Sequence, residues 1–237
     1  MDSMHHNTYI LDFKQGDVTG NGFPDTIYLT GQKTTPNDIY SDNISIVIQT
    51  WSSNAPIGIP LPNASGYDAE LFVGHFTSSR KLDILVSIDT GGSGRYVLAY
   101  LYTIKDNIPV LLLDSTGFNR DSMYAAVFLN DFKVSVKNHS NSTTFIIDVE
   151  SNKDMYINDG IYDINGRLLK PTEGGVLGLG ALWPVAETYS GMYSLLALQR
   201  IIGINNADNL GAVQTYLKWN GKKLIPDRVQ VAILPTI

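Results

Sequence analysis

The chain has 237 residues, of which 43% are hydrophobic and 17% charged, and its formal net charge is −6 at pH 7. This composition is globular, and the acidic balance argues against a nucleic-acid or anionic-membrane partner. The absence of cysteine excludes disulfides and thiolate metal sites. The sequence has no apolar run of the roughly 18 residues that a membrane-spanning helix needs, so no membrane span is expected.

Short runs rich in Val, Ile, Leu, Tyr and Thr alternate with clusters of Gly, Asn, Pro and Ser along the chain, which predicts an all-β protein. The predicted strands span residues 26–30, 44–51, 69–73, 83–88, 96–102, 110–113, 125–129, 133–137, 144–149, 194–202, 213–219 and 229–234. Asn220-Gly221 and Asn165-Gly166 lie between apolar runs and predict tight hairpin turns. Residues 1–8 are expected to be a disordered or non-native start. Residues 9–237 are expected to form one domain, because no Pro/Ser-rich linker divides them.

A calcium loop is predicted near the start, where the chain reads Asp-Val-Thr-Gly-Asn-Gly-Phe-Pro-Asp. The predicted ligands are the side chains of Asp17, Thr19, Asn21 and Asp25 and the main-chain carbonyl of Phe23. Alternating oxygen side chains suit Ca²⁺, which takes six to eight oxygen ligands, and the glycines between them allow a tight loop. The alternative is a metal-free turn in which Asp17 and Asn21 accept hydrogen bonds from backbone amides.

The loop recurs along the chain. Gly-His-Phe-Thr at residues 74–77, followed by Asp83, matches the first copy at a spacing of 58 residues. A more divergent copy covers residues 186–194, close to two periods later, and a weak one is expected near residue 131. The period predicts about four units of three to four strands. Such units suggest a small β-propeller-like repeat fold of about four blades, and a duplicated β-sandwich is the alternative.

The unit Gly-Asp-Val-Thr-Gly-Asn-Gly-Phe-Pro-Asp-Thr-Ile at residues 16–27 resembles the FG-GAP/VCBS repeat. The stretches at residues 90–94, 199–201 and 210–221 add a likeness to small VCBS-repeat-containing surface or spore-associated proteins of Bacillus-type bacteria. The resemblance implies a propeller-like fold with structural calcium. It also implies a non-catalytic interaction or adhesion module at an extracellular, cell or spore surface.

Departures from that repeat limit the metal prediction to the first loop. The second copy has His75 at the first ligand position and Arg80 within the loop, and the third has Ala186 and Ser194 at the first and last positions. The expected partner is a protein or polysaccharide, and the chain is expected to be a monomer. The alternative function is a propeller-type hydrolase acting on glycans or esters.

Two further patterns have ordinary explanations. Asp89-Thr90-Gly91 resembles the aspartic-protease signature, but that chemistry needs two carboxylates, and the glycines that follow favour a hairpin tip. Tyr96, Tyr100 and Tyr102 alternate and could form a sugar-stacking face, although packing in the core is the more common role of such residues.

Overall fold

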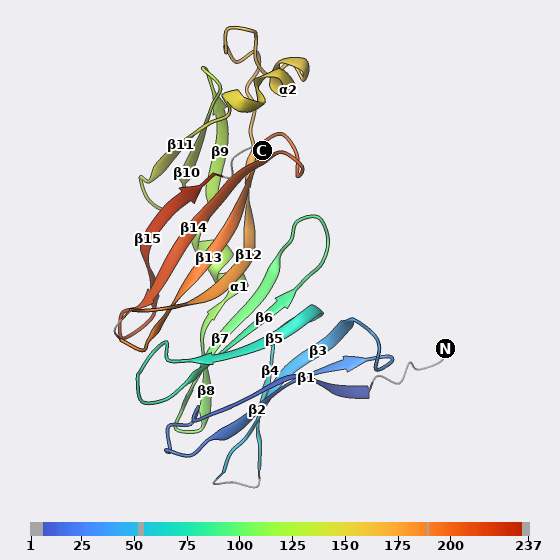
Figure 1. Ribbon diagram of the computed structural model, residues 1–237, viewed down its shortest axis with the longest axis vertical. Coiled ribbons are helices and arrows are strands. Elements are labelled where there is room, and N and C mark those ends of the chain that lie inside the picture. The colour runs from blue at the N-terminus through green and yellow to red at the C-terminus, as the bar shows by residue number, and fades with distance from the viewer. Residues whose placement is uncertain (1–6, 52–54, 189, 234–237) are drawn as a thin grey trace.

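The computed structural model of the chain describes residues 7–51, 55–188 and 190–233 (Figure 1). Its strands are β1 (Asn7–Gly16), β2 (Asp25–Lys33), β3 (Tyr40–Gln49), β4 (Ile57–Pro60), β5 (Gly66–Gly74), β6 (Asp83–Asp89), β7 (Val97–Lys105), β8 (Ile108–Asp114), β9 (Tyr124–Leu129), β10 (Lys133–Asn138), β11 (Thr144–Asp148), β12 (Gly175–Ala186), β13 (Tyr193–Ile202), β14 (Asn209–Trp219) and β15 (Leu224–Ala232). Its helical segments are α1 (Ser115–Asp121), η1 (Glu150–Asn152) and α2 (Lys153–Asn158). The all-β prediction is therefore confirmed. Among these residues no helix is long and apolar enough to cross a membrane.

The strands form antiparallel meanders that follow chain order. One sheet has the order β1-β2-β3-β5-β6-β7-β8, with β4 beside β3; a second has β11-β10-β9 and a third β12-β13-β14-β15. The first sheet consists of two nearly separate parts, β1–β4 and β5–β8, because β3 and β5 are joined only through the pairs Tyr40–Tyr67 and Ser41–Gly66. The described chain thus contains four meanders of three or four strands, as the repeat period predicts.

The repeated loop marks the start of each meander. The three copies recognised in the sequence lie in the β1–β2, β5–β6 and β12–β13 turns, and the weak copy lies in the β9–β10 turn. In the first two turns the closing strand pairs are Gly16–Asp25 and Gly74–Asp83. The repeat is therefore a hairpin-forming device that precedes the second strand of each unit.

The sheets follow one another along the long axis of an elongated molecule, with β1–β4 at one end and β9–β11 with α2 at the other (Figure 1). None of the three sheets closes on itself. This layout is compatible with packed sandwich-like layers, and a ring of propeller blades is not confirmed.

Some predicted boundaries were wrong. Asn7 and Thr8 belong to β1, opposite Lys33 and Gln32, and are not part of a disordered start; residues 1–6 lie outside the described ranges. The sequence reading missed β1, β4 and β12. The Asn165-Gly166 turn forms, with Asp163 accepting through its carbonyl from Gly166, but its flanks make an isolated bridge and not two strands.

Three hydrophobic clusters hold the layers together. The first lies between β1–β4 and β5–β8, and the second joins the other face of β5–β8 and α1 to one half of the β12–β15 sheet. The third joins the other half of that sheet to β9–β11 and α2. Leu195 and Ala197 belong to the second cluster and Ile201 to the third, although all three lie on the same face of β13. The long C-terminal sheet therefore uses one face along its length to join both halves of the molecule.

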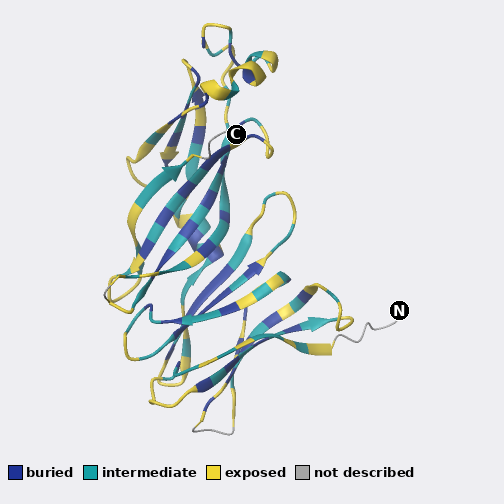
Figure 2. Ribbon diagram, viewed as in Figure 1, coloured by how far each residue is buried: buried dark blue, intermediate teal, exposed yellow. Residues whose placement is uncertain are grey.

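The face of β12–β15 that carries Leu195, Ala197 and Ile201 is buried in these clusters. The opposite face of the sheet is directed toward solvent. Figure 2 shows buried positions alternating with partly exposed ones along these strands. We call this second side of the sheet the outward face.

Candidate functional site

In the first loop the side chains hydrogen-bond to the loop's own backbone. Asp17 Oδ1 accepts from the amides of Gly20 and Asn21 at 2.6 and 3.1 Å, and its Oδ2 accepts from the amide of Gly22 at 2.8 Å. Asn21 Oδ1 accepts from the amide of Phe23 at 2.8 Å. These contacts are the ones expected of the metal-free turn.

Asp25 serves a different set of donors. Its Oδ2 accepts from the amides of Val18 and Thr19 at 3.1 and 3.0 Å and from the Thr19 hydroxyl at 3.0 Å. Its Oδ1 is buried and has no hydrogen-bond partner in the described part of the chain, so it is the one carboxylate oxygen there that could accept a cation without losing a protein contact. Calcium binding by this loop stays a prediction, and it would require Asp17 to exchange amide contacts for metal contacts.

The second copy reproduces the same hydrogen bonds without the calcium ligands. Asp83 accepts from the amides of Phe76 and Thr77 at 3.1 and 2.8 Å and from the Thr77 hydroxyl. His75, at the position of Asp17, directs Nδ1 at the carbonyls of Ser78 and Lys81. The last aspartate of both copies therefore has a structural role that is independent of metal.

The other residues singled out in the sequence are structural as well. Asp89 Oδ1 accepts from the amide of Gly91 at 2.7 Å, at the tip of the β6–β7 hairpin. Tyr100 and Tyr102 are buried in the core and do not form an exposed stacking face, while Tyr96 precedes β7. Burial, with a smaller contribution from the Asp114 carboxylate, raises the pKa of Tyr100 to about 12.

The outward face of β12–β15 carries a row of side chains that crosses all four strands. Trp183 lies opposite Leu196, Leu196 opposite Tyr216, and Tyr216 opposite Arg228. Residues directly opposite each other in antiparallel strands share a face of the sheet and touch. Trp183 is 54% exposed, so a large indole lies at the surface at one end of this row.

Two polar contacts stabilise the outward face. The Arg228 guanidinium lies 4.0 Å from the centre of the Tyr216 ring, which is a cation–π contact. In the next row Gln230 Nε2 donates to Gln214 Oε1 at 2.6 Å. These contacts fix hydrogen-bonding groups on β14 and β15, at the opposite end of the row from the exposed indole.

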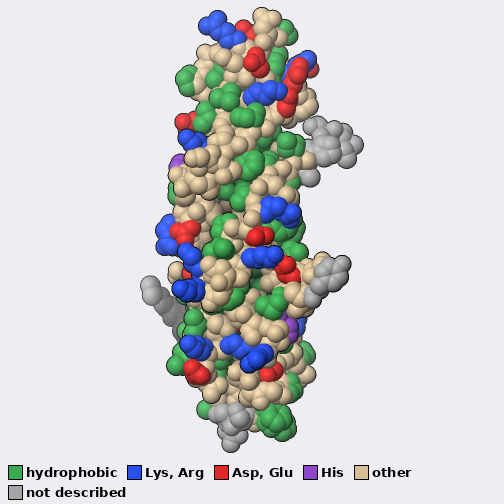
Figure 3. Space-filling model, turned by 90° about the vertical axis from the view of Figure 1, so that its left-hand side faces the viewer, with side chains coloured by type: hydrophobic (Ala, Val, Ile, Leu, Met, Phe, Trp, Pro, Cys, Tyr) green, Lys and Arg blue, Asp and Glu red, His purple; other side chains and the backbone are tan. Residues whose placement is uncertain are grey.

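Charged side chains border the row. Lys218 Nζ lies 3.2 Å from Glu187 Oε2 and 3.9 Å from Asp227 Oδ2. Beside them is an open hollow of about 280 Å³, lined by Val185, Ala186, Glu187, Thr188, Ser194, Tyr216, Lys218, Asp227 and Arg228. Figure 3, which views the side of the molecule that carries β15, shows charges of both signs interspersed across the middle of the surface.

We call Trp183, Tyr216, Arg228 and the Glu187–Lys218–Asp227 cluster the outward site. The sequence pattern does not predict this site, because no strand is predicted between residues 149 and 194 and Trp183 therefore lies outside every predicted strand. The apolar run from Val176 to Val185 was the available signal. The third loop copy is visible in the sequence as a repeat, but the pattern does not predict that its residues Glu187, Thr188 and Ser194 line a surface hollow.

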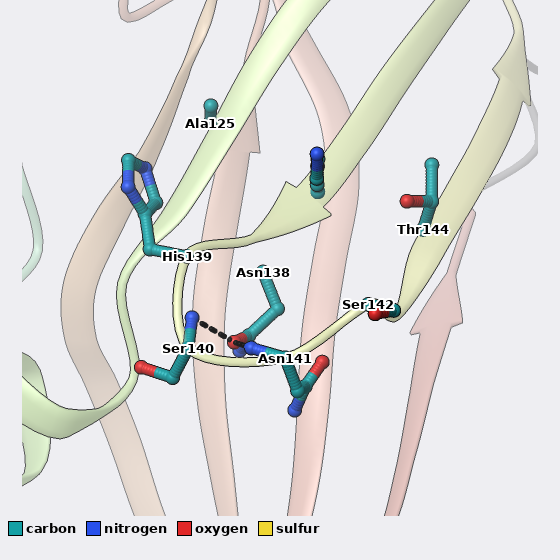
Figure 4. A pocket seen from close by; sticks show the side chains of 8 residues that line it. Ala125, Asn138, His139, Ser140, Asn141, Ser142 and Thr144 are labelled. Atoms are coloured by element: carbon teal, nitrogen blue, oxygen red, sulfur yellow. Dashed lines mark hydrogen bonds between the residues drawn. The ribbon is translucent and has the colours of Figure 1, made fainter.

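A second hollow lies at the end of the β9–β11 sheet (Figure 4). Its lining is polar, but Asn138 Oδ1 accepts from the amides of Ser140 and Asn141 at 2.7 and 3.0 Å and so holds the β10–β11 turn. This hollow is lined by the exposed imidazole of His139 but by no indole or phenol ring and no cluster of paired charges, so the outward site is the stronger candidate.

The fold and the site together define an all-β protein with an exposed aromatic and charged sheet face. The family model of the YybI C-terminal domain matches residues 122–232, the segment that contains β9–β15 and therefore the outward site. The uncharacterized protein YybI of Bacillus subtilis (strain 168) is 38% identical over 224 residues, which cover 94% of this chain and 85% of that relative. The chain belongs to the YybI family.

No solved structure matches the chain. The matches to YybI also correct the resemblance to the FG-GAP/VCBS repeats that the sequence suggests: they show the YybI family and no FG-GAP/VCBS family, so that resemblance is wrong. The repeated hairpin turn that suggested it is present, and in its first two copies a buried aspartate, Asp25 or Asp83, closes the hairpin.

Proposed function

We propose that this protein is a non-catalytic binding module that holds a neutral polysaccharide on the outward site. A ligand of this kind is found at cell and spore surfaces, which is where the proposal places the protein. The observation that carries the proposal is the cross-strand row, in which an exposed indole and a hydrogen-bonding guanidinium lie on one side of a rigid sheet.

The aromatic end of the row supplies the apolar part of sugar recognition. The face of an indole carries negative quadrupole potential, and the C–H groups on one side of a pyranose ring are weakly positive and apolar. Stacking a sugar on Trp183 also removes exposed apolar surface from water. Since the indole lies on a strand, its backbone is already ordered, and only the side chain loses conformational freedom when a ligand binds it.

The charges favour a neutral ligand. The outward site carries two acidic groups, Glu187 and Asp227, and two basic ones, Lys218 and Arg228, so its formal charge sums to zero. Lys218 contacts both carboxylates, and Arg228 is held by Tyr216. Hydroxyl groups both donate and accept hydrogen bonds, so a neutral polysaccharide can bond to the acidic and to the basic groups of the site. A strongly charged polymer would be repelled by the two groups that carry its own sign.

One observation favours hydrolysis of a glycan as a second candidate. Glu187 and Asp227 both lie within reach of the Lys218 ammonium and line one hollow, and glycoside hydrolysis uses two carboxylates. A hydrolase would release reducing ends from a bound polysaccharide, and Glu187→Gln would abolish that release while leaving stacking on Trp183 intact. If the protein is a binding module, neither the wild type nor this variant releases reducing ends.

The test is retardation in native gels cast with neutral polysaccharides (dextran, starch, xylan, galactomannan and mixed-linkage β-glucan), with polygalacturonate as the anionic comparison. We expect at least one neutral polymer to retard the protein and Trp183→Ala to weaken that binding about tenfold or more, which corresponds to about 1.4 kcal/mol. Trp51→Ala is the matched control, because Trp51 is also exposed but lies two residues beyond the end of β3, which belongs to another sheet. Absence of retardation by every neutral polymer, or equal loss in both variants, would overturn the proposal.

A further inference from the structure

The chain contains three Asn-Gly pairs, at residues 21–22, 165–166 and 220–221. We propose that Asn220, and neither Asn21 nor Asn165, is the site of a self-catalysed modification, in which the side chain cyclises to a succinimide that hydrolyses to aspartate and isoaspartate. A following glycine favours this reaction at all three pairs, because it has no side chain to obstruct the attacking nitrogen. The folded structure selects among them, and this selection is independent of the proposed function.

The reaction consumes water and needs no other group from outside the chain. The Gly221 nitrogen loses its proton to solvent base and attacks Cγ of Asn220, which forms the N–Cγ bond and moves negative charge onto Oδ1. The Cγ–Nδ2 bond then breaks as Nδ2 takes up a proton and leaves as ammonia. Water opens the ring at either carbonyl carbon, so the neutral side chain is replaced by a carboxylate.

The Oδ1 atom of Asn220 lies where backbone donors stabilise that negative charge. It accepts from the amides of Lys222 and Lys223, both at 3.0 Å. Backbone N–H groups at this distance form the oxyanion holes of acyl-transfer enzymes, because donors that are in place before the reaction stabilise the charge as it develops. Within the described residues, Asn21 Oδ1 accepts from a single amide, that of Phe23.

The attacking nitrogen is free at only one of the three pairs in the part of the chain that the structure describes. The Gly22 amide donates to Asp17 Oδ2 at 2.8 Å. The Gly166 amide donates to the Asp163 carbonyl at 3.0 Å, and Gly166 is buried. Gly221 is exposed, and its amide has no hydrogen-bond partner among the described residues. A Cβ placed on Gly221 would meet nothing within 4 Å, so this turn has room for the ring to form.

The neighbouring charges favour the same pair. Asp17 Oδ1 accepts from the amide of Asn21 at 3.1 Å, and Asp163 Oδ1 accepts from the amide of Asn165 at 2.9 Å. A carboxylate this close opposes both the loss of a proton from the glycine nitrogen and the growth of negative charge on the asparagine oxygen. The turn that begins at Asn220 carries two lysines and no carboxylate.

The modification changes the β14–β15 turn. Residues 220–223 connect the closing strand pair Trp219–Leu224. Isoaspartate routes the main chain through its β-carbon and so lengthens this short turn, and either product places a carboxylate beside the two lysines. One added negative charge takes the formal net charge of the chain from −6 to −7.

The first test follows the full chain at mildly alkaline pH by peptide mass spectrometry, which detects the replacement of the amide NH₂ by OH at each pair. We expect Asn220 to convert faster than Asn21 and Asn165 by about tenfold or more. The same incubation in urea removes the turns and should bring the three rates together, because glycine follows each asparagine. Equal rates in the folded chain, or a lead of Asn220 that persists in urea, would overturn the proposal.

A second test measures the ammonia released by two matched variants. Asn220→Ser removes the leaving group and keeps a side chain suited to turns, so the fast phase of ammonia release should disappear. Asn165→Ser is the control and should retain the fast phase. Circular dichroism before the incubation checks that both variants are folded. A fast phase that survives in Asn220→Ser, or that is lost in Asn165→Ser, would contradict the assignment.

Discussion

Replacing Asp83 by alanine tests whether the repeated turns depend on their buried aspartates. The Asp83 side chain is fully buried and accepts from two backbone amides and the Thr77 hydroxyl. Its removal leaves these donors without a partner. A buried unsatisfied donor costs about 1–3 kcal/mol, and the Phe76 amide is the most deeply buried of the three. We expect a loss of about 4 kcal/mol in the free energy of unfolding, since such penalties do not add fully.

Urea unfolding followed by far-ultraviolet circular dichroism measures this loss. Asp25→Ala should cost about 3 kcal/mol, because Asp25 makes the same contacts through one oxygen only. Asp17→Ala is the matched comparison: its amide partners are exposed and water replaces the carboxylate, so about 1 kcal/mol is expected. If Asp83→Ala cost no more than Asp17→Ala, the view that the buried aspartates close these hairpins would be refuted.

Three other predictions concern metal, pH and the C-terminal half. If the first loop binds calcium, millimolar calcium will raise the melting temperature of the wild type and not of Asp17→Ala; the metal-free turn gives the same melting temperature with calcium and with EDTA. Burial raises the pKa of Asp12, but the hydrogen bonds that its carboxylate accepts from the Lys14 ammonium and from backbone amides outweigh burial and hold the pKa below its ordinary value. The stability from Asp12 is therefore present above about pH 4 and lost as the pH falls through its folded pKa, and Asp12→Asn should flatten the acid limb of a stability–pH curve. Tyr156→Phe removes a buried hydroxyl that donates to both oxygens of Asp208 at 2.9 Å, and urea unfolding should show a loss of about 2 kcal/mol.

The repeat was the part of the fold that the sequence predicted best. A buried aspartate that closes a hairpin needs fixed neighbours, so Thr19 with Asp25 and Thr77 with Asp83 left the same pattern at the same spacing. Hairpin closure, however, says nothing about how sheets pack against one another. The choice between ring and stacked layers depends on contacts such as Tyr40–Tyr67, which no local pattern encodes.

The outward site was harder to predict because its residues come from separate strands. Trp183 and Arg228 are 45 positions apart in the chain and meet in one row only through the register of three strand pairs. The metal hypothesis for the first loop drew on a local pattern. That pattern has two physical uses, because oxygen side chains at alternate positions can bind either a cation or the loop's own amides.

The most direct test of the proposed function uses the three tryptophans of the chain, Trp51, Trp183 and Trp219. A variant that keeps Trp183 alone is titrated with the neutral polysaccharide that gives the strongest retardation, and its fluorescence spectrum is followed. A sugar stacked on the indole excludes water, so we predict a saturable shift to shorter wavelength in this variant. A spectrum that stays constant while the variant still binds, or a shift confined to the variant that keeps Trp51 alone, would contradict the outward site as the place of binding.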